Sequence, residues 1–442
     1  MQTNDIIVAP ATALGGAIAV IRLSGNGSVA CCERIFKGRK SLVEAKSHTI
    51  HYGTICDGER VVDDVVVAVF RAPHSYTGEE SVEISIHGSR YIASEVVRLL
   101  CEEGARMAEA GEFSQRALAT GRIDLSQAEA VADLIAAESR AAHAVAATQM
   151  RGGYSELLEQ LREELLNITT LLELELDFSE EDVEFADRTR LRSMLEHTDS
   201  VVMRLMESFR VGNAIREGVS VAIVGKPNVG KSTLLNRLVG EDRAMVSDIA
   251  GTTRDTIEES IVIDDIRFRF IDTAGLRDTD DRLEQMGIER TERAMRQAQV
   301  IIYMLEPSDQ EYSTPQLRDE QRLLLVVNKI DTTSERGVEG AICISARDGE
   351  GVDVLRGALR DTVDTEGLYR GEVVVSNMRH FEALSRAHEA MQAALLALDM
   401  GVSEELLAED IRRAITALAE ITGAITSDDI LRSVFSRFCI GK

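Results

Sequence analysis

The chain has 442 residues, a formal net charge of −26 and 44% hydrophobic residues. This length allows two to four domains with apolar cores, and no apolar run approaches the ~18 residues of a membrane span. The acidic excess disfavours a protein that coats nucleic acid, because phosphate binding needs clustered Lys and Arg, but a local basic patch remains compatible with tRNA. The N-terminus lacks signal-peptide features and no Cys-x-x-Cys pair occurs, so we expect a cytoplasmic protein without a disulfide framework or zinc site.

Residues 1–116 are predicted to form an α+β domain. Residues 61–70 are rich in β-branched side chains, and residues 81–87 alternate polar with apolar ones; both patterns are typical of strands. Residues 89–101 carry apolar side chains at helical spacing, so a helix is expected after the second strand.

Residues 117–216 and 367–442 are predicted to be helical, because Ala, Leu and Glu dominate both segments. In the first segment, Leu157, Leu161, Leu165, Ile168, Leu171 and Leu172 form one predicted apolar stripe. The acidic run 173–184 has no ligand-like spacing and is interpreted as solvated surface rather than a metal site. The shared composition favours one discontinuous helical domain, and the alternative is two separate bundles.

Residues 217–366, between the helical segments, are predicted to form an α/β domain. Short apolar runs alternate here with helical stretches, which indicates βαβ units and a mainly parallel sheet. The expected strands are 219–224, 268–271, 300–305, 323–327 and 341–344. Each ends near a polar motif, at the sheet edge where such folds bind ligands.

Residues 225–232 read Gly-Lys-Pro-Asn-Val-Gly-Lys-Ser, which is a phosphate-binding loop between the first of these strands and a helix expected over 233–239. Its glycines allow backbone N–H groups to point at phosphates, Lys231 reaches the β- and γ-phosphates, and the Ser232 hydroxyl ligates Mg²⁺. Further along, Asp272 is placed to hold Mg²⁺ through a water, and the Gly275 amide can sense the γ-phosphate.

The segment Asn-Lys-Ile-Asp at 328–331 predicts that the base is guanine. The Asp331 carboxylate can accept hydrogen bonds from the ring N–H and the exocyclic amine, a donor pair that adenine lacks. Lys329 can lie over the base, Asn328 can brace the loop, and backbone N–H groups around Ser345 and Ala346 can donate to the guanine carbonyl. A site built on such bonds rejects the wrong base because its polar groups would be left unpaired.

Leu276 follows Asp-Thr-Ala-Gly at 272–275, where Ras-like GTPases have the Gln that orients the attacking water. Hydrolysis must therefore rely on other groups. Asn228 is a potential cation ligand, and the carboxylate candidates are Asp278, Asp280, Asp281 and Glu284. The residues alone do not choose among them.

Longer segments carry a family resemblance. They are residues 246–255, 272–277, 286–290, 421–423 and 438–442, together with 21–25, 75–79, 110–114 and 124–130. Over its whole length the chain resembles the MnmE (TrmE) family of tRNA-modification GTPases. The resemblance implies an N-terminal tetrahydrofolate-binding and dimerisation domain (1–116), a discontinuous helical domain (117–216 and 367–442) and an inserted Ras-like P-loop GTPase domain (217–366).

The resemblance also implies the reaction. A homodimer whose GTPase domains are activated by K⁺-dependent dimerisation would work with an FAD-dependent, MnmG-like partner in a heterotetramer. It would add an aminomethyl or carboxymethylaminomethyl group to carbon 5 of the wobble uridine of certain tRNAs. The one-carbon unit would come from 5-formyltetrahydrofolate or methylenetetrahydrofolate.

Site residues follow from the same resemblance. Glu284 would orient the hydrolytic water, Ser232 and Thr253 would bind Mg²⁺, and Asn228, Ser247, Ile249 and Thr252 would surround K⁺. The GTP site would comprise Asn228, Val229, Gly230, Lys231, Ser232, Thr233, Ser247, Asp248, Ile249, Ala250, Gly251, Thr252, Thr253, Asp272, Thr273, Ala274, Gly275, Asn328, Lys329, Asp331, Ser345, Ala346 and Arg347.

The implied folate ligands are Arg22, Glu83, Arg122 and Lys442. Arg122 replaces a Lys of well-known members, and the loop 11–16 is shorter than usual and lacks its Pro and Arg residues. Cys439 would act in the modification step. From its residues alone the tail has a second interpretation, because Leu431, Phe435 and Cys439 share one stripe of a predicted helix and the thiol could simply pack.

Two alternatives remain at this stage. One is a ribosome-assembly GTPase similar to Era or Der, although neither an RNA-binding domain after the GTPase domain nor a second GTPase domain is visible. The other is a GTP-gated dimerisation switch without chemistry of its own.

Overall fold

The computed structural model describes residues 5–177, 188–242, 259–271, 284–309, 312–318, 321–333, 338–363, 372–436, 438 and 441. They belong to two compact units. The first comprises residues 1–132, 149–167 and 415–442, and the second comprises residues 133–148 and 168–414. Among the described residues, none of the helices combines the length and apolar content that a bilayer crossing requires.

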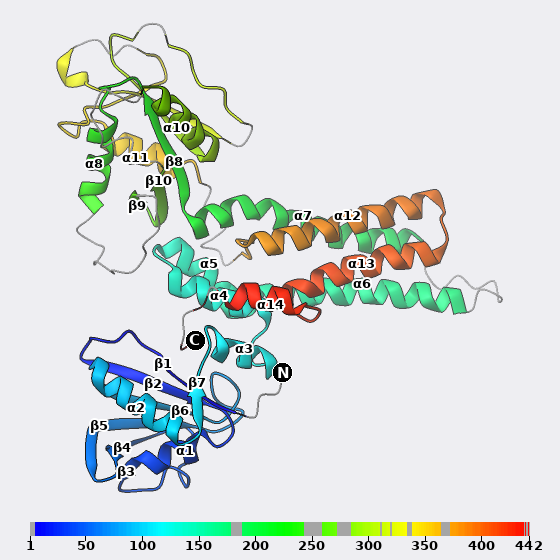
Figure 1. Ribbon diagram of the computed structural model, residues 1–442. Coiled ribbons are helices and arrows are strands. Elements are labelled where there is room, and N and C mark those ends of the chain that lie inside the picture. The colour runs from blue at the N-terminus through cyan, green and yellow to red at the C-terminus, as the bar shows by residue number, and fades with distance from the viewer. Residues whose placement is uncertain are drawn as a thin grey trace. The chain divides into compact units, whose positions relative to one another are not determined.

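A seven-stranded sheet with the order β3-β4-β5-β6-β2-β1-β7 forms most of the first unit (Figure 1). All neighbouring strands are antiparallel except β1 and β7. One face of the sheet buries its apolar side chains beneath α1 and α2. The elements are β1 (Ile6–Pro10), β2 (Ile18–Ser24), α1 (Ser28–Ile35), β3 (Phe36–Gly38), β4 (Thr49–Asp57), β5 (Arg60–Phe70), β6 (Ser81–His87), α2 (Arg90–Glu102) and β7 (Ala105–Met107).

Three helices continue this unit: α3 (Glu112–Ala119), α4 (Leu125–Ala136), which extends into the second unit, and α14 (Asp428–Phe435). Side chains of α4 and α14 share an apolar cluster that includes Leu125, Phe435 and Phe438. The Ser427 hydroxyl accepts a hydrogen bond from the Ile430 N–H and caps α14.

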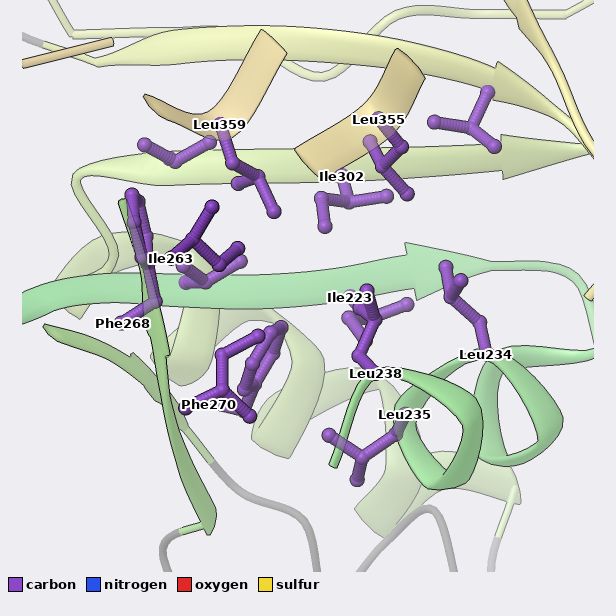
Figure 2. Close-up of a cluster of buried hydrophobic side chains, with 14 of the residues drawn as sticks. Ile223, Leu234, Leu235, Leu238, Ile263, Phe268, Phe270, Ile302, Leu355 and Leu359 are labelled. Carbon is purple, nitrogen blue, oxygen red and sulfur yellow. The ribbon is translucent and has the colours of Figure 1, made fainter. Parts of the chain in front are cut away.

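The second unit contains a six-stranded sheet with the order β13-β12-β11-β8-β10-β9. All neighbouring strands are parallel except β10 and β9, so the predicted parallel sheet is confirmed. Leucines of α8 and α11 cover it, packing against Ile223, Phe268 and Ile302 (Figure 2). The elements are β8 (Val219–Gly225), α8 (Lys231–Asp242), β9 (Glu259–Ile263), β10 (Ile266–Phe270), α10 (Glu284–Gln297), β11 (Val300–Leu305), β12 (Arg322–Val327), η2 (Ile330–Thr332), β13 (Ile342–Cys343) and α11 (Val352–Arg360).

Helices that precede and follow this sheet in the sequence pack together. The rings of Phe209 in α7 and Phe381 in α12 stack with centroids 4.6 Å apart. The Asp199 carboxylate lies 2.7 Å from Nδ1 of His388. The contact confirms one discontinuous helical domain rather than two bundles. The remaining helices are α5 (Arg140–Met150), α6 (Gly153–Asp177), α7 (Arg188–Glu217), α12 (Met378–Met400) and α13 (Glu404–Thr422).

One detail of the predicted stripe in α6 was wrong. Leu157 and Leu171 are only half-buried, and Leu158 is buried instead. A helix of this length shifts its buried face gradually, so a stripe drawn from Leu spacing alone can start one residue off.

Candidate functional site

The phosphate loop connects the central strand β8 to α8 and has the backbone of an anion cradle. Gly225, Asn228 and Gly230 all have positive φ angles, of 152°, 62° and 103°. Val229 is fully buried and anchors the loop, while Asn228 is exposed. A Cβ on Gly225 would lie 2.5 Å from the Met304 carbonyl oxygen of β11, so only glycine fits beside that strand.

Lys231 is held inside this loop. Its ammonium donates hydrogen bonds to the backbone carbonyls of Gly225 and Lys226, at 2.9 and 2.8 Å. Burial lowers the pKa of Lys231. Ser232 is half-buried and Thr233 is exposed in the first turn of α8, where the helix dipole and free N–H groups favour a bound phosphate.

Asn328 joins the phosphate loop to the base-recognition segments. Its Nδ2 donates to the Val229 carbonyl at 2.7 Å, and its Oδ1 accepts from the Ala346 N–H at 2.9 Å. A Cβ on Gly230 would lie 2.2 Å from Nδ2 of Asn328. The loop therefore approaches Asn328 so closely that a side chain at position 230 would displace it.

Asp331 and Lys329 are both held from neighbouring segments. The fully buried Ser345 hydroxyl donates to Oδ1 of Asp331 at 2.9 Å, and Asp331 itself is exposed. Lys329 has a left-handed backbone, with φ 67°, and its ammonium pairs with the Glu306 carboxylate. These contacts fix both side chains at the carboxyl end of β12.

The backbone amides of Ala346 and Arg347, both expected at the GTP site, differ in their hydrogen-bond partners. The Ala346 N–H is engaged by Asn328, whereas within the described part of the chain the Arg347 N–H has no hydrogen-bond acceptor. Arg347 therefore presents the available amide in this loop.

Many predicted nucleotide and cation ligands lie outside the described residues. Glu284 is the first residue of α10, but its side chain is likewise outside the described part. The positions concerned are Ser247, Asp248, Ile249, Ala250, Gly251, Thr252, Thr253, Asp272, Thr273, Ala274 and Gly275.

The predicted folate ligands Arg22 and Glu83 face each other in the first unit. They are paired across β2 and β6, and Nη2 of Arg22 lies 2.8 Å from Oε1 of Glu83. The Arg22 guanidinium also lies over the rings of Tyr76 and Phe113, at 5.3 and 5.7 Å from their centroids. Such a charged pair beside aromatic faces suits a flat, polar heterocycle.

The chain terminus lies beside this pair. Nη1 of Arg22 is 3.5 Å from the Gly441 carbonyl oxygen, and a Cβ on Gly441 would lie 2.1 Å from the Pro10 carbonyl oxygen. Cys439 and Lys442 lie outside the described residues. Arg122 is exposed.

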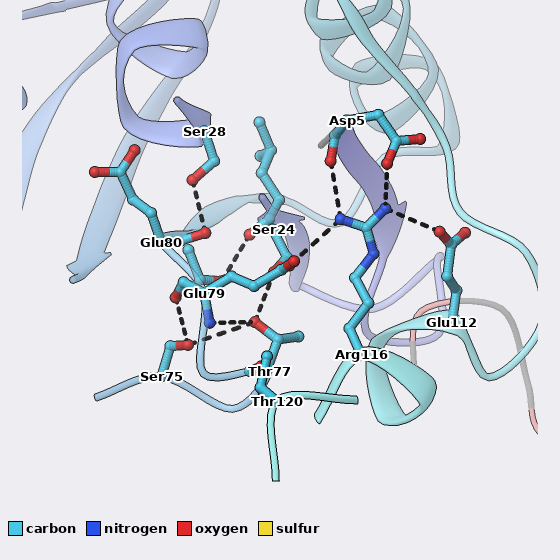
Figure 3. Close-up of polar contacts among 12 residues, drawn as sticks. Asp5, Ser24, Ser28, Ser75, Thr77, Glu79, Glu80, Glu112, Arg116 and Thr120 are labelled. Atoms are coloured by element: carbon cyan, nitrogen blue, oxygen red, sulfur yellow. Dashed lines mark hydrogen bonds and ion pairs between the residues drawn. The ribbon is translucent and has the colours of Figure 1, made fainter. Parts of the chain in front are cut away.

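Figure 3 shows an ion network around the buried Arg116. The network links the segments that carry Tyr76 and Phe113, and the sequence did not reveal it. The Arg116 guanidinium donates to the Asp5 carboxylate at 2.8 Å, to Glu112 at 3.0 Å and to Glu79 at 3.3 Å. It thereby ties the segment of Tyr76 to α3, which carries Phe113. The only sequence signal was the resemblance of segments 75–79 and 110–114 to a family, which gave no role for Arg116.

Among the described residues, no group of three or more His, Cys, Asp or Glu side chains is arranged to hold a metal ion.

Two family models match the chain. One, described as MnmE helical domain, matches residues 125–439, and the other, GTP-binding protein TrmE N-terminus, matches residues 6–122. A relative from Bacteroides thetaiotaomicron is 48% identical over 100% of both chains, and one from Porphyromonas gingivalis is 47% identical over 99% of this chain and 98% of its own. Both relatives are named tRNA modification GTPase MnmE.

Among solved structures, Era in complex with MgGDPNP and a segment of 16S ribosomal RNA is 26% identical. The match covers 40% of this chain and 67% of that one, with a TM-score of 0.24. A score this low carries no argument about fold, which rests on the sheet topology and the family models.

Proposed function

Because the chain belongs to the MnmE family of tRNA modification GTPases, we propose that it couples GTP hydrolysis to modification of carbon 5 of the wobble uridine in certain tRNAs. The observation that carries the proposal is the nucleotide site in the second unit. There, Asn328 joins the phosphate loop to the segments that would read guanine. The family models that match residues 6–122 and 125–439 disfavour a ribosome-assembly role similar to that of Era or Der.

In the proposed nucleotide site, Lys231 would exchange its two loop carbonyls for the β- and γ-phosphate oxygens of GTP. Its half-buried ammonium acts in a partly desolvated place, where charge stabilisation is stronger than in water. The Asp331 carboxylate, oriented by Ser345, would select guanine, and the Lys329 stem would cover the base.

The described cation ligands fit their proposed ions. The Ser232 hydroxyl lies in the first turn of α8 and would hold Mg²⁺ together with Thr253. Asn228 projects from the exposed part of the phosphate loop and would hold K⁺ together with Ser247, Ile249 and Thr252. A bound K⁺ supplies positive charge against the phosphates, and Glu284 would orient the water in place of the Gln that Leu276 replaces.

The first unit would hold the tetrahydrofolate carrier, which supplies the one-carbon unit when bound. The Glu83 carboxylate can accept two N–H donors of a pterin ring, and the ion pair with Arg22 holds that carboxylate in place. Arg122 and Lys442 would add positive charge for the carboxylates of the carrier. Cys439 would act in the modification step.

We further propose a homodimer that forms a heterotetramer with an FAD-dependent, MnmG-like protein in the cytoplasm. We also propose that the chain divides into modules at residues 1–116, 117–216, 217–366 and 367–442. Dimerisation of the GTPase modules around K⁺ would complete each active site.

Mass spectrometry of tRNA nucleosides tests the function. A deletion strain should lose the C5 substituent of the wobble uridine, wild-type chain should restore it, and Lys231→Ala should fail to restore it. Unchanged nucleosides in the deletion strain would refute the proposal. A Cys439→Ser strain separates the remaining alternative, because full modification there would favour a GTP-gated switch over a catalytic cysteine.

A further inference from the structure

Arg237, in α8, holds the loop around Ser345, Ala346 and Arg347, which is expected to contact the base. Its guanidinium donates to the Arg347 carbonyl through Nη2 and to the Ala346 carbonyl, 3.4 Å from Nε. Arg237 was not singled out by any motif. Its planar fork can hold two successive carbonyls at once, which a single ammonium cannot do in one fixed geometry.

Because the peptide group is planar, the contacts with Arg237 also set the direction of the Arg347 N–H. In a trans peptide the C=O and N–H bonds point in opposite directions, and the Ala346–Arg347 peptide is trans. Because Arg237 holds the Ala346 carbonyl toward α8, the Arg347 N–H of the same peptide points away from α8.

The next peptide shows what lies on that opposite side. The Arg347 carbonyl faces Arg237, and the Asp348 N–H of the same peptide donates to the Ser345 hydroxyl at 3.2 Å. That hydroxyl in turn donates to the Asp331 carboxylate at 2.9 Å. The side of the loop opposite Arg237 is therefore the side of Asp331.

We propose that Arg237 is a positioning residue for guanine recognition: it holds the Ala346–Arg347 peptide so that the Arg347 N–H donates to the 6-oxo group of the base. This inference rests on the guanine site proposed above. Asp331 reads the ring N–H and the exocyclic amine, and the Arg347 amide reads the carbonyl. The Ala346 N–H already donates to Asn328, so this amide cannot replace the Arg347 N–H as the donor to the base.

Nucleotide analogues separate the two halves of base recognition. 6-Thio-GDP weakens only the acceptor at position 6, whereas inosine diphosphate lacks only the exocyclic amine that Asp331 would read. Dissociation constants for GDP and both analogues are measured by competition with a fluorescent GDP on the full chain. Loss of one neutral hydrogen bond corresponds to about a three- to tenfold change in affinity.

The wild-type chain should prefer GDP over 6-thio-GDP by about that factor. Arg237→Ala should abolish this preference but keep the preference for GDP over inosine diphosphate. Arg237→Lys should give an intermediate preference, because one ammonium reaches one carbonyl. Arg296→Ala removes an exposed arginine of α10 that pairs with Glu292, and it should change neither ratio.

Two results would overturn the inference. One is an unchanged preference for GDP over 6-thio-GDP in Arg237→Ala. The other is a parallel collapse of both preferences, which would mean that Arg237 only holds the domain together. Failure of the underlying guanine site looks different, because the wild-type chain would then bind ADP as tightly as GDP.

Discussion

Gly230 and Asn328 should be energetically coupled, because the space that an alanine at position 230 needs is occupied by the Asn328 amide. The added Cβ of Gly230→Ala would lie 2.2 Å from Nδ2, well inside contact distance. Asn328 would then have to leave its place, and both of its buried hydrogen bonds, to the Val229 carbonyl and from the Ala346 N–H, would be lost.

The magnitudes follow from these contacts. Each buried group left without a partner costs about 1–3 kcal/mol, so Asn328→Ala, which leaves two such groups, should destabilise the phosphate loop by about 2–6 kcal/mol. Gly230→Ala loses the same two bonds and adds roughly 1–3 kcal/mol of strain at its φ of 103°. In the double variant the clash disappears and the bonds are lost only once. Its destabilisation should be smaller than the sum of the single effects by about 2 kcal/mol or more.

Hydrogen exchange of the β8 and β12 amides measures these local opening free energies without assuming two-state unfolding of a chain with two units. Gly240→Ala is the matched control, because it places a Cβ in α8, the helix that follows Gly230, with nothing within 4 Å, and it should add independently to Asn328→Ala. Additivity of Gly230→Ala and Asn328→Ala within about 0.5 kcal/mol would show that the backbone yields instead, and the reasoning would fail.

Three further outcomes test the proposed sites. GTP turnover should be at least about tenfold faster in K⁺ than in Na⁺, and Asn228→Ala should remove most of the difference; equal wild-type rates in both salts would exclude the K⁺ site. Arg22→Ala should weaken binding of 5-formyltetrahydrofolate in calorimetry by about tenfold or more without changing GDP affinity, and undiminished binding would remove Arg22 from that site. Burial by itself would raise the pKa of Glu112, but the hydrogen bond from Arg106 and the other contacts outweigh it and hold that pKa below its usual range. The resulting stability is present above about pH 5 and is lost as pH falls through the folded-state pKa. The protection factors of the α3 amides, which compare the exchange rate with the intrinsic rate at the same pH, should therefore fall below about pH 4 in wild type and depend less on pH in Glu112→Gln. Identical pH profiles would contradict this.

Several strands could be predicted because burial of one or both faces produces a local sequence pattern, either alternating polar and apolar residues or a continuous apolar run. The run 300–305 matches β11, and the run 81–87 matches β6. Six strands of the described residues escaped prediction: β1, β2, β3, β4, β7 and β9. The strand β7 has only 3 residues and pairs with β1 across about a hundred residues of sequence, so its existence depends on a tertiary contact that no local pattern records.

The candidate site divides in the same way. Motifs placed Lys231, Asn328 and Asp331, because phosphate and guanine chemistry demands those side chains at fixed spacing. Arg116 and Arg237 carry no motif. Their importance comes from residues that folding brings to them: Asp5 is 111 positions from Arg116, and Arg347 is 110 positions from Arg237. Such contacts can be read only from coordinates.

The turn that follows β11, at residues 306–309, contributes contacts to the proposed nucleotide site although it belongs to none of the motifs. Its backbone closes on itself, since the Asp309 N–H donates to the Glu306 carbonyl and the Glu306 N–H to the Asp309 carboxylate, both at 2.9 Å. From this one turn, Asp309 pairs with Lys226 of the phosphate loop and Glu306 pairs with Lys329 of the base-recognition segment. Because β11 lies between β8 and β12, the turn spans the two loops that GTP must bridge. Each lysine is therefore paired with a carboxylate of one hydrogen-bonded turn, which lowers the ordering cost of nucleotide binding.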